Sequence, residues 1–147
     1  MVDKMDAAQV DATLKTALNH QSTTILSMAL LAGCLRGVNA VAIKQNLRAF
    51  VLDELEDTYL LVEKLSALGG SPHLNSSALE LPSDTTGALT GLMEHENAAV
   101  AALHQVIAHS GQEPRSEALE HLLEHVIMRK QQQIDFLWHA VDTGGSV

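Results

Sequence analysis

The chain has 147 residues, which is enough for one domain and hard to divide into two. Its 9 Lys and Arg residues against 18 Asp and Glu residues give a net charge of −9, which argues against a nucleic-acid partner, because phosphate binding needs clustered basic side chains. Aromatic residues make up only 3% of the chain, so the core must be aliphatic, and three prolines with few β-branched runs predict an all-helical protein. Cys34 has no second cysteine to pair with, and the first residues lack the apolar segment of a signal peptide. The longest apolar run, 25–35, is too short to cross a bilayer, so we expect a cytoplasmic protein without a membrane partner.

Four helices are predicted in a single domain that covers residues 1–147. Apolar side chains recur at three- and four-residue spacing over about 6–36, 40–68, 84–109 and 114–141. The first break is at Gly37, and Gly69-Gly70-Ser71-Pro72 ends the second helix through a left-handed cap. Ser83 or Asp84 is the expected N-cap of the third helix, and Pro114 suits the first turn of the fourth.

The lengths of the connections predict how the helices are ordered in space. The first and third connections hold only a few residues, so each joins two antiparallel neighbours. The second, from Gly69 to Pro82, can reach roughly 46 Å when extended at about 3.3 Å per residue. The helix before it is roughly 43 Å long at about 1.5 Å per residue. The connection can therefore return along the whole bundle, and one such crossover between helices 2 and 3 is the ferritin-like form of an all-α four-helix bundle.

Each predicted helix carries polar residues near the middle of its apolar stripe. They are Gln21, Glu54 with Asp57 one turn later, Glu96, and Lys130 with Gln133. A buried carboxylate without a partner is costly, so these groups must meet one another, a metal or a ligand. Glu54, Asp57 and Glu96 are the candidate metal ligands, because carboxylates on facing helices can converge on one cation. The alternative is that the stripes are displaced by one position and these residues face solvent.

Three segments carry a family resemblance that extends from about Leu14 to Trp138. They are Asp53-Glu54-Leu55-Glu56-Asp57, Glu63-Lys64-Leu65-Ser66-Ala67-Leu68-Gly69-Gly70-Ser71-Pro72, and Ile134-Asp135-Phe136-Leu137. They are similar to the EExxH helix of the bacterioferritins, to its Leu-Gly-Gly-x-Pro end, and to the tail of the second ExxH helix. The chain therefore resembles the bacterioferritin branch of the ferritin-like superfamily.

The resemblance implies where a di-iron site would lie. The family takes one Glu from the first helix, Glu-x-x-His from the second, one Glu from the third and Glu-x-x-His from the fourth. The corresponding residues here are Gln21, Glu54 with Asp57, Glu96, and Lys130 with Gln133. Only Glu54 and Glu96 match. The three carboxylates of Glu54, Asp57 and Glu96, together with the ammonium of Lys130, have a net charge that balances at most one divalent ion. Because Lys130 can itself act as the counter-charge, we expect either no cofactor or a single iron or other divalent ion.

These residues predict a bacterioferritin-like protein with a degenerate di-iron site. Ferroxidase chemistry needs two irons held together, so we predict no catalytic residue and a structural, interaction or non-di-iron binding role. One alternative is an iron-binding or iron-storage ferritin with an altered, mononuclear metal site. Another is a carrier of a small molecule or haem at a dimer interface.

The first helix predicts a partner for the chain. Residues 25–35 are apolar almost all round the helix, and such a helix is expected to be buried on every side. In the resembled family the first two helices form a two-fold interface, so we expect a homodimer or larger homo-oligomer through helices 1 and 2. Cys34 is expected to be a buried, inert thiol. His121 and His125 have a spacing that can chelate a metal, but neighbouring leucines take the inner face, so we expect both to face solvent.

Overall fold

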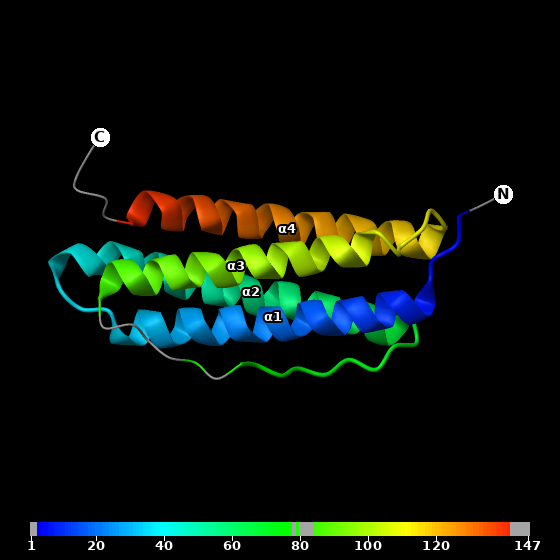
Figure 1. The fold of residues 1–147 in the computed structure, drawn as a ribbon, viewed down its shortest axis with the longest axis horizontal. Coiled ribbons are helices and arrows are strands. Elements are labelled where there is room, and N and C mark those ends of the chain that lie inside the picture. Colours follow the sequence, from blue (N-terminus) through cyan, green and yellow to red (C-terminus); the bar gives the residue numbers. More distant parts are fainter. Residues whose placement is uncertain (1–2, 78, 80–83, 142–147) are drawn as a thin grey trace.

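The computed structural model describes residues 3–77, 79 and 84–141, and it consists of four long helices. These are α1 (Ala7–Cys34), α2 (Val41–Ala67), α3 (Thr85–Ile107) and α4 (Pro114–Ala140), with a short 3₁₀ turn, η1 (Val38–Ala40), before α2. The four helices lie side by side as one bundle (Figure 1). Their bounds fall within two residues of the predicted ones, whereas η1 was not predicted.

The helix ends follow the predicted signals. Asp6 and Asp84 cap α1 and α3, and each accepts a hydrogen bond from a backbone N–H three residues later, at 3.2 and 3.1 Å. Pro114 is the first residue of α4, and Gly69 has a φ of +88° just after α2. The other predicted N-cap, Ser83, lies outside the described residues.

A long crossover joins α2 to α3 and runs beside α1 (Figure 1). Three side chains of α1 hold it by accepting hydrogen bonds from its backbone N–H groups: Asp11 from Ser71 at 3.1 Å, Asn19 from Asn75 at 3.0 Å, and Thr23 from Ser77 at 3.3 Å. The crossover thus returns the chain to the end where α2 began, and α3 runs parallel to α2 and antiparallel to α1 and α4. The predicted ferritin-like topology is confirmed.

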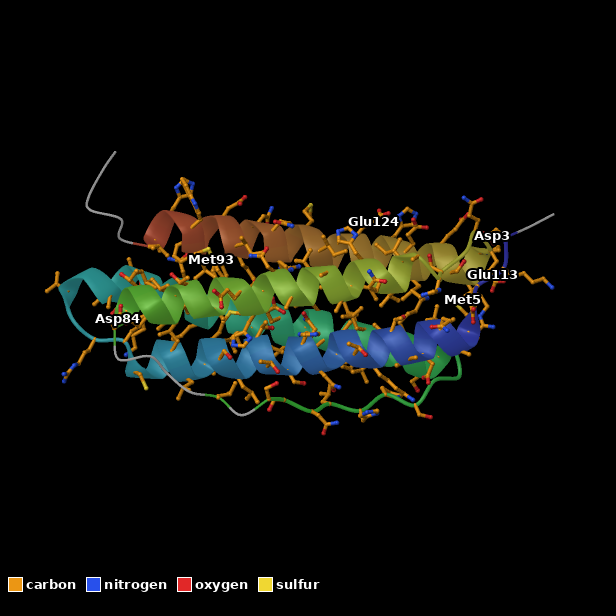
Figure 2. All side chains as sticks on the ribbon, in the orientation of Figure 1. Asp3, Met5, Asp84, Met93, Glu113 and Glu124 are labelled. Atoms are coloured by element: carbon orange, nitrogen blue, oxygen red, sulfur yellow. The ribbon has the colours of Figure 1, made fainter. Side chains whose placement is uncertain are left out.

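The N-terminal segment closes one end of the bundle. The carbonyl of Asp3 accepts a hydrogen bond from the N–H of Gln112 at 2.7 Å, and the N–H of Asp6 donates to the carbonyl of His109 at 3.0 Å. In Figure 2, Asp3 and Glu113 lie together at this end, and Asp84 lies at the opposite end. The loop between α3 and α4 is therefore held by the segment that precedes α1.

The core is divided into two aliphatic clusters by a layer of polar side chains. One cluster includes Leu14, Leu61, Leu103 and Leu123, and the other includes Met28, Leu47, Leu92 and Leu137. Along each helix the polar stripe residues fall between these two groups. The bundle thus positions six polar side chains at its middle, where every helix contributes at least one.

The outer side of α1 differs from what its sequence suggested in one respect. Cys34 is exposed, so the prediction of a buried thiol is wrong. The thiol points outward because Leu31 and Leu35 occupy the inner side of this turn. Leu26 and Leu30 are also exposed, at 46% and 37%, which leaves an apolar face of α1 uncovered by the described residues of its own chain. Within the described residues, no helix is both long enough and apolar enough to cross a membrane.

Candidate functional site

All six polar stripe residues are buried in the middle of the bundle. Gln21, Glu54, Glu96 and Lys130 are 0% exposed, and Asp57 and Gln133 are 1% exposed. The alternative in which these residues face solvent is therefore wrong. His121 and His125, in contrast, are both exposed, as predicted.

Lys130 lies at the centre of this layer and joins two carboxylates. Its Nζ donates to Oε1 and Oε2 of Glu54 at 2.9 and 3.1 Å, and to Oε1 of Glu96 at 3.1 Å. Oγ1 of Thr24 lies 3.4 Å from the same nitrogen. The ammonium group therefore sits where charges from α2, α3 and α4 converge, and it is excluded from solvent.

Two amides complete the shell around the carboxylates. Nε2 of Gln21 donates to Oε2 of Glu54 at 2.8 Å and to Oγ1 of Thr58 at 3.2 Å. With its amide nitrogen turned toward the carboxylates, Gln133 donates to Oε2 of Glu96 at 2.8 Å and to Oε1 of Glu54 at 2.6 Å. Each carboxylate is thus surrounded by nitrogen donors, and we call this group of Gln21, Glu54, Glu96, Lys130 and Gln133 the lysine cluster.

Asp57 is not part of the lysine cluster, because it pairs with Arg129 of α4. Oδ2 of Asp57 lies 2.9 Å from Nε of Arg129, but the angle is not that of a hydrogen bond, so the contact is an ion pair only. Arg129 also lies 3.4 Å from Oδ1 of Asp53 and 2.9 Å from Nε2 of His125. Both carboxylate oxygens of Asp57 and the amide oxygen of Gln21 have no hydrogen-bond donor among the described residues.

Burial changes the acidity of two carboxyl groups. Desolvation raises the pKa of Glu96 to about 7, although the neighbouring ammonium of Lys130 acts in the opposite direction. Desolvation also raises the pKa of Asp57, and the guanidinium of Arg129 opposes that shift. A proton on Glu96 would leave one carboxylate facing one ammonium, so the lysine cluster can reach electrical neutrality without a metal.

The side chains present do not fit a pair of iron ions. Lys130 and the two glutamines offer nitrogen donors to the very oxygen atoms that would ligate a metal, and an ammonium group cannot itself bind a cation. The described part of the chain contains no group of three or more His, Cys, Asp or Glu side chains placed to hold a metal ion. A metal-binding role for Glu54, Asp57 and Glu96 stays a prediction.

The comparisons with known proteins agree with this architecture. A family profile described as the ferritin-like domain matches residues 11–144. The chain belongs to the ferritin-like family. No protein with a curated description matches this ferritin-like sequence.

Solved structures similar to this ferritin-like chain come from several bacteria. A ferritin-like di-iron-carboxylate protein of Bacillus anthracis str. Ames is 18% identical, with a TM-score of 0.85 over 93% of this chain and 98% of that one. A dodecameric thioferritin, the bacterioferritin-related protein of Bacteroides fragilis, is 14% identical, with a TM-score of 0.82 over 93% and 86%. The Desulfovibrio desulfuricans bacterioferritin, with its di-iron site, is 16% identical, with a TM-score of 0.78 over 90% and 78%. At these identities the likeness shows the fold alone.

The sequence pattern missed two members of the polar layer. Arg129 was overlooked because it precedes Lys130 by one residue and its side chain is only partly buried, at 29% exposure. Thr24 was overlooked because a threonine in an apolar stretch is not distinctive. No sequence signal identifies Arg129 as the partner of Asp57, because the two residues lie on different helices.

Proposed function

We propose that this ferritin-like protein has lost ferroxidase chemistry and acts as a structural or interaction subunit. The observation that carries the proposal is the position of Lys130, whose Nζ lies within 3.1 Å of oxygen atoms on both Glu54 and Glu96. These are the two residues that match the di-iron pattern of the resembled family. A positive charge of the chain itself takes the role that iron would have there.

The electrostatic balance supports the same proposal. Bringing a divalent cation to Glu54 and Glu96 would place it against the buried ammonium, at a separation where like charges repel strongly in a medium of low dielectric constant. Gln21 also lacks the negative charge of the glutamate in the family pattern, and Gln133 lacks the imidazole of the histidine. A second metal would have no ligand set left.

Metal analysis of the protein purified without chelators tests this proposal, together with thermal melts under anaerobic conditions with and without Fe²⁺. We expect less than roughly a tenth of an equivalent of metal per chain and no shift in Tm. A metal that bound only the folded state would stabilise it and raise Tm, so an unchanged Tm indicates that no tight site exists. The chain should also oxidise Fe²⁺ no faster than buffer does. One or two bound equivalents, with a clear rise in Tm, would overturn the proposal.

A variant with restored ligands provides the matched control. Gln21→Glu, Asp57→His, Lys130→Glu and Gln133→His together recreate the family pattern around Glu54 and Glu96. If this variant folds, as judged by circular dichroism, it should bind Fe²⁺ in the assay in which the natural chain does not. Equal iron binding by the two proteins would show that the substituted residues do not decide metal occupancy.

A second candidate function is iron handling at a single altered site. It is favoured by two buried acceptor atoms without donors, namely Oδ1 of Asp57, whose other oxygen pairs with Arg129, and the amide oxygen of Gln21. A cation beside Asp57 would satisfy such acceptors. The metal analysis above separates the two functions, since the second requires about one equivalent.

The subunit role includes self-association through α1 and α2. Six large apolar side chains are exposed on these two helices: Leu26, Leu30, Val41, Leu52, Leu55 and Tyr59. Large exposed apolar patches are typical of protein interfaces. The Bacteroides fragilis thioferritin is a dodecamer, and we infer that this chain likewise forms a homo-oligomer.

A further inference from the structure

The middle of the crossover is held to α1 at two points that lie two residues apart. The N–H of Asn75 donates to Oδ1 of Asn19 at 3.0 Å, and the N–H of Ser77 donates to Oγ1 of Thr23 at 3.3 Å. Asn19 and Thr23 are four residues apart, which is a rise of about 6 Å along a helix. Two residues of extended chain cover nearly the same distance, at roughly 3.3 Å each. The crossover is therefore extended here and in register with α1, beside which it runs in Figure 1.

Ser76 lies between these two anchors, and its backbone N–H is not used by either. In an extended chain the groups of neighbouring residues point to opposite sides, so this N–H is directed away from α1. Among the residues that the structure describes, it has no hydrogen-bond partner, and the side-chain amide of Asn75 has none either. Both residues are exposed. An exposed asparagine side chain is thus followed directly by a free backbone nitrogen on a small residue.

We propose that Asn75 is a site of spontaneous deamidation. The backbone nitrogen of Ser76 attacks Cγ of Asn75 and loses its proton, the C–N bond of the side-chain amide breaks, and ammonia leaves with that proton. The product is a cyclic imide, a succinimide. Water that attacks Cγ opens this ring to aspartate, and water that attacks the main-chain carbonyl carbon opens it to isoaspartate. The net reaction consumes one water and releases one ammonia, and it needs no oxidant or reductant.

Formation of isoaspartate would detach the middle of the crossover from α1. It brings the β-carbon of residue 75 into the main chain, which lengthens the path between the two anchoring N–H groups by one bond of roughly 1.5 Å. The two N–H groups then no longer fit the spacing of Asn19 and Thr23, so at least one of the two hydrogen bonds is lost. Either product also adds a negative charge to a chain that already carries −9. The attachment of the crossover thus weakens as the protein ages.

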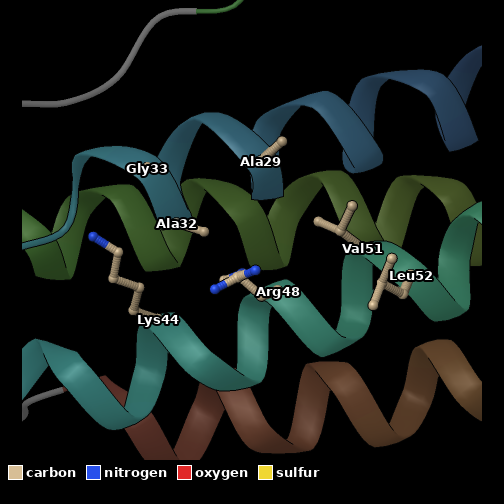
Figure 3. A pocket seen from close by; sticks show the side chains of 7 residues that line it. All are labelled: Ala29, Ala32, Gly33, Lys44, Arg48, Val51 and Leu52. Atoms are coloured by element: carbon tan, nitrogen blue, oxygen red, sulfur yellow. The ribbon is translucent and has the colours of Figure 1, made fainter.

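Deamidation of Asn75 goes beyond the proposed function and is independent of it. Asn75 and Ser76 lie outside the lysine cluster, so the metal content of the protein does not bear on the reaction. They are also absent from the groove between α1 and α2, where Figure 3 shows Lys44 and Arg48 extending from α2 toward α1. A failure of either proposal therefore leaves the other standing.

Peptide mapping by mass spectrometry tests the proposal on full-length protein that is aged in warm, mildly alkaline buffer. The peptide that contains Asn75 should gain about 1 Da with time, because an amide NH₂ is replaced by OH, and should separate into aspartate and isoaspartate forms. Asn97 is the matched internal control, since it is exposed and is followed by the small residue Ala98, but both lie inside α3. We expect Asn97 to react at least about tenfold more slowly, because its helix must first open locally.

Ser76→Val tests the role of the attacking nitrogen at an exposed position. The β-branched side chain crowds this nitrogen, so deamidation of Asn75 should slow by about tenfold. Equal rates at Asn75 and Asn97, or an unchanged rate in Ser76→Val, would overturn the proposed site.

Hydrogen exchange on the aged protein tests the detachment of the crossover. The amides of residues 75 and 77 should exchange faster in the isoaspartate fraction than in fresh protein, while exchange within the four helices stays the same. Unchanged exchange at these two amides would show that the crossover remains attached, and the proposed consequence would then be wrong.

Discussion

At the scale of single residues, the most unusual group is the fully buried ammonium of Lys130, which faces the carboxylates of Glu54 and Glu96. A buried ion pair seldom makes a fold more stable than an apolar core of the same volume would. Its removal from one side only is costly, because charges are then left in the core without a partner. Single substitutions in the lysine cluster should therefore destabilise the fold, whereas substitutions that remove both partners of an ion pair should be tolerated.

Lys130→Met should lower the free energy of unfolding by about 3–5 kcal/mol, since it leaves the buried carboxylate of Glu54, and that of Glu96 where it is ionised, without a counter-charge. Urea denaturation followed by circular dichroism measures this change. The triple variant Glu54→Gln, Glu96→Gln, Lys130→Met should recover most of the loss, because it removes the stranded charges as well. A loss below about 1 kcal/mol in the single variant would show that Lys130 is not the counter-charge.

The raised pKa of Glu96 predicts how stability depends on pH. The folded chain holds this proton up to about pH 7, whereas the unfolded chain releases it near the ordinary value of 4.5. The contribution to stability is therefore full below pH 4.5 and is lost as the pH rises through 7. Urea denaturation at several pH values should show that Glu96→Gln flattens the decline over this window. Glu94→Gln, at an exposed site two residues earlier, should leave the decline unchanged.

Much of the polar layer follows from the sequence, because a period of 3.6 residues identifies which side chains face inward. All six stripe residues were assigned correctly to the interior in this way. The partner of Asp57 could not be obtained from that period. Asp57 lies at the edge of the inner face of α2, and whether it reaches Lys130 or Arg129 depends on how α2 and α4 are rotated against each other, which only the packed bundle determines.

At the scale of elements, helix ends were predictable where a cap or a glycine specifies the backbone. Asp84 and Gly69 are examples, since the first supplies an acceptor for free N–H groups and the second adopts a left-handed conformation. The 3₁₀ turn η1 was not predictable, because Val38–Ala40 carries no such signal. Its form is set by the geometry of joining α1 to α2 within a few residues.

Two glycines are expected to respond in opposite ways to substitution by alanine. Gly111 has a φ of +69°, and a Cβ there would lie 2.6 Å from the carbonyl carbon of Lys4, so Gly111→Ala should cost about 1–3 kcal/mol. Gly91 lies inside α3 with nothing within 4 Å of its Cβ position, so Gly91→Ala should add up to about 1 kcal/mol. Thermal and urea denaturation of both variants measure the contrast. A stable Gly111→Ala protein would mean that the N-terminal segment does not pack on this loop as described.

At the scale of the whole molecule, the apolar outer side of α1 and α2 decides the assembly. Leu26→Lys with Leu55→Lys should lower the molar mass in solution, because two charges would be buried in the proposed interface. Met128→Lys, at a similarly exposed position on α4, should leave the mass unchanged. Multi-angle light scattering measures both. A natural chain that elutes at the mass of one 15.8 kDa subunit would contradict self-association.

The crossover has a consequence for how the chain can be divided. It links two helical hairpins, α1 with α2 and α3 with α4, and its exposed stretch at Asn75 and Ser76 lies outside every helix. A cut at this point would separate Glu54, on the first hairpin, from Lys130, on the second. The first fragment alone would then hold the buried carboxylates of Glu54 and Asp57 without Lys130 and Arg129, which lie on the second fragment, so it would need the second in order to fold. The protein is thus suited to fragment complementation, in which two separately produced pieces report their encounter by becoming structured together.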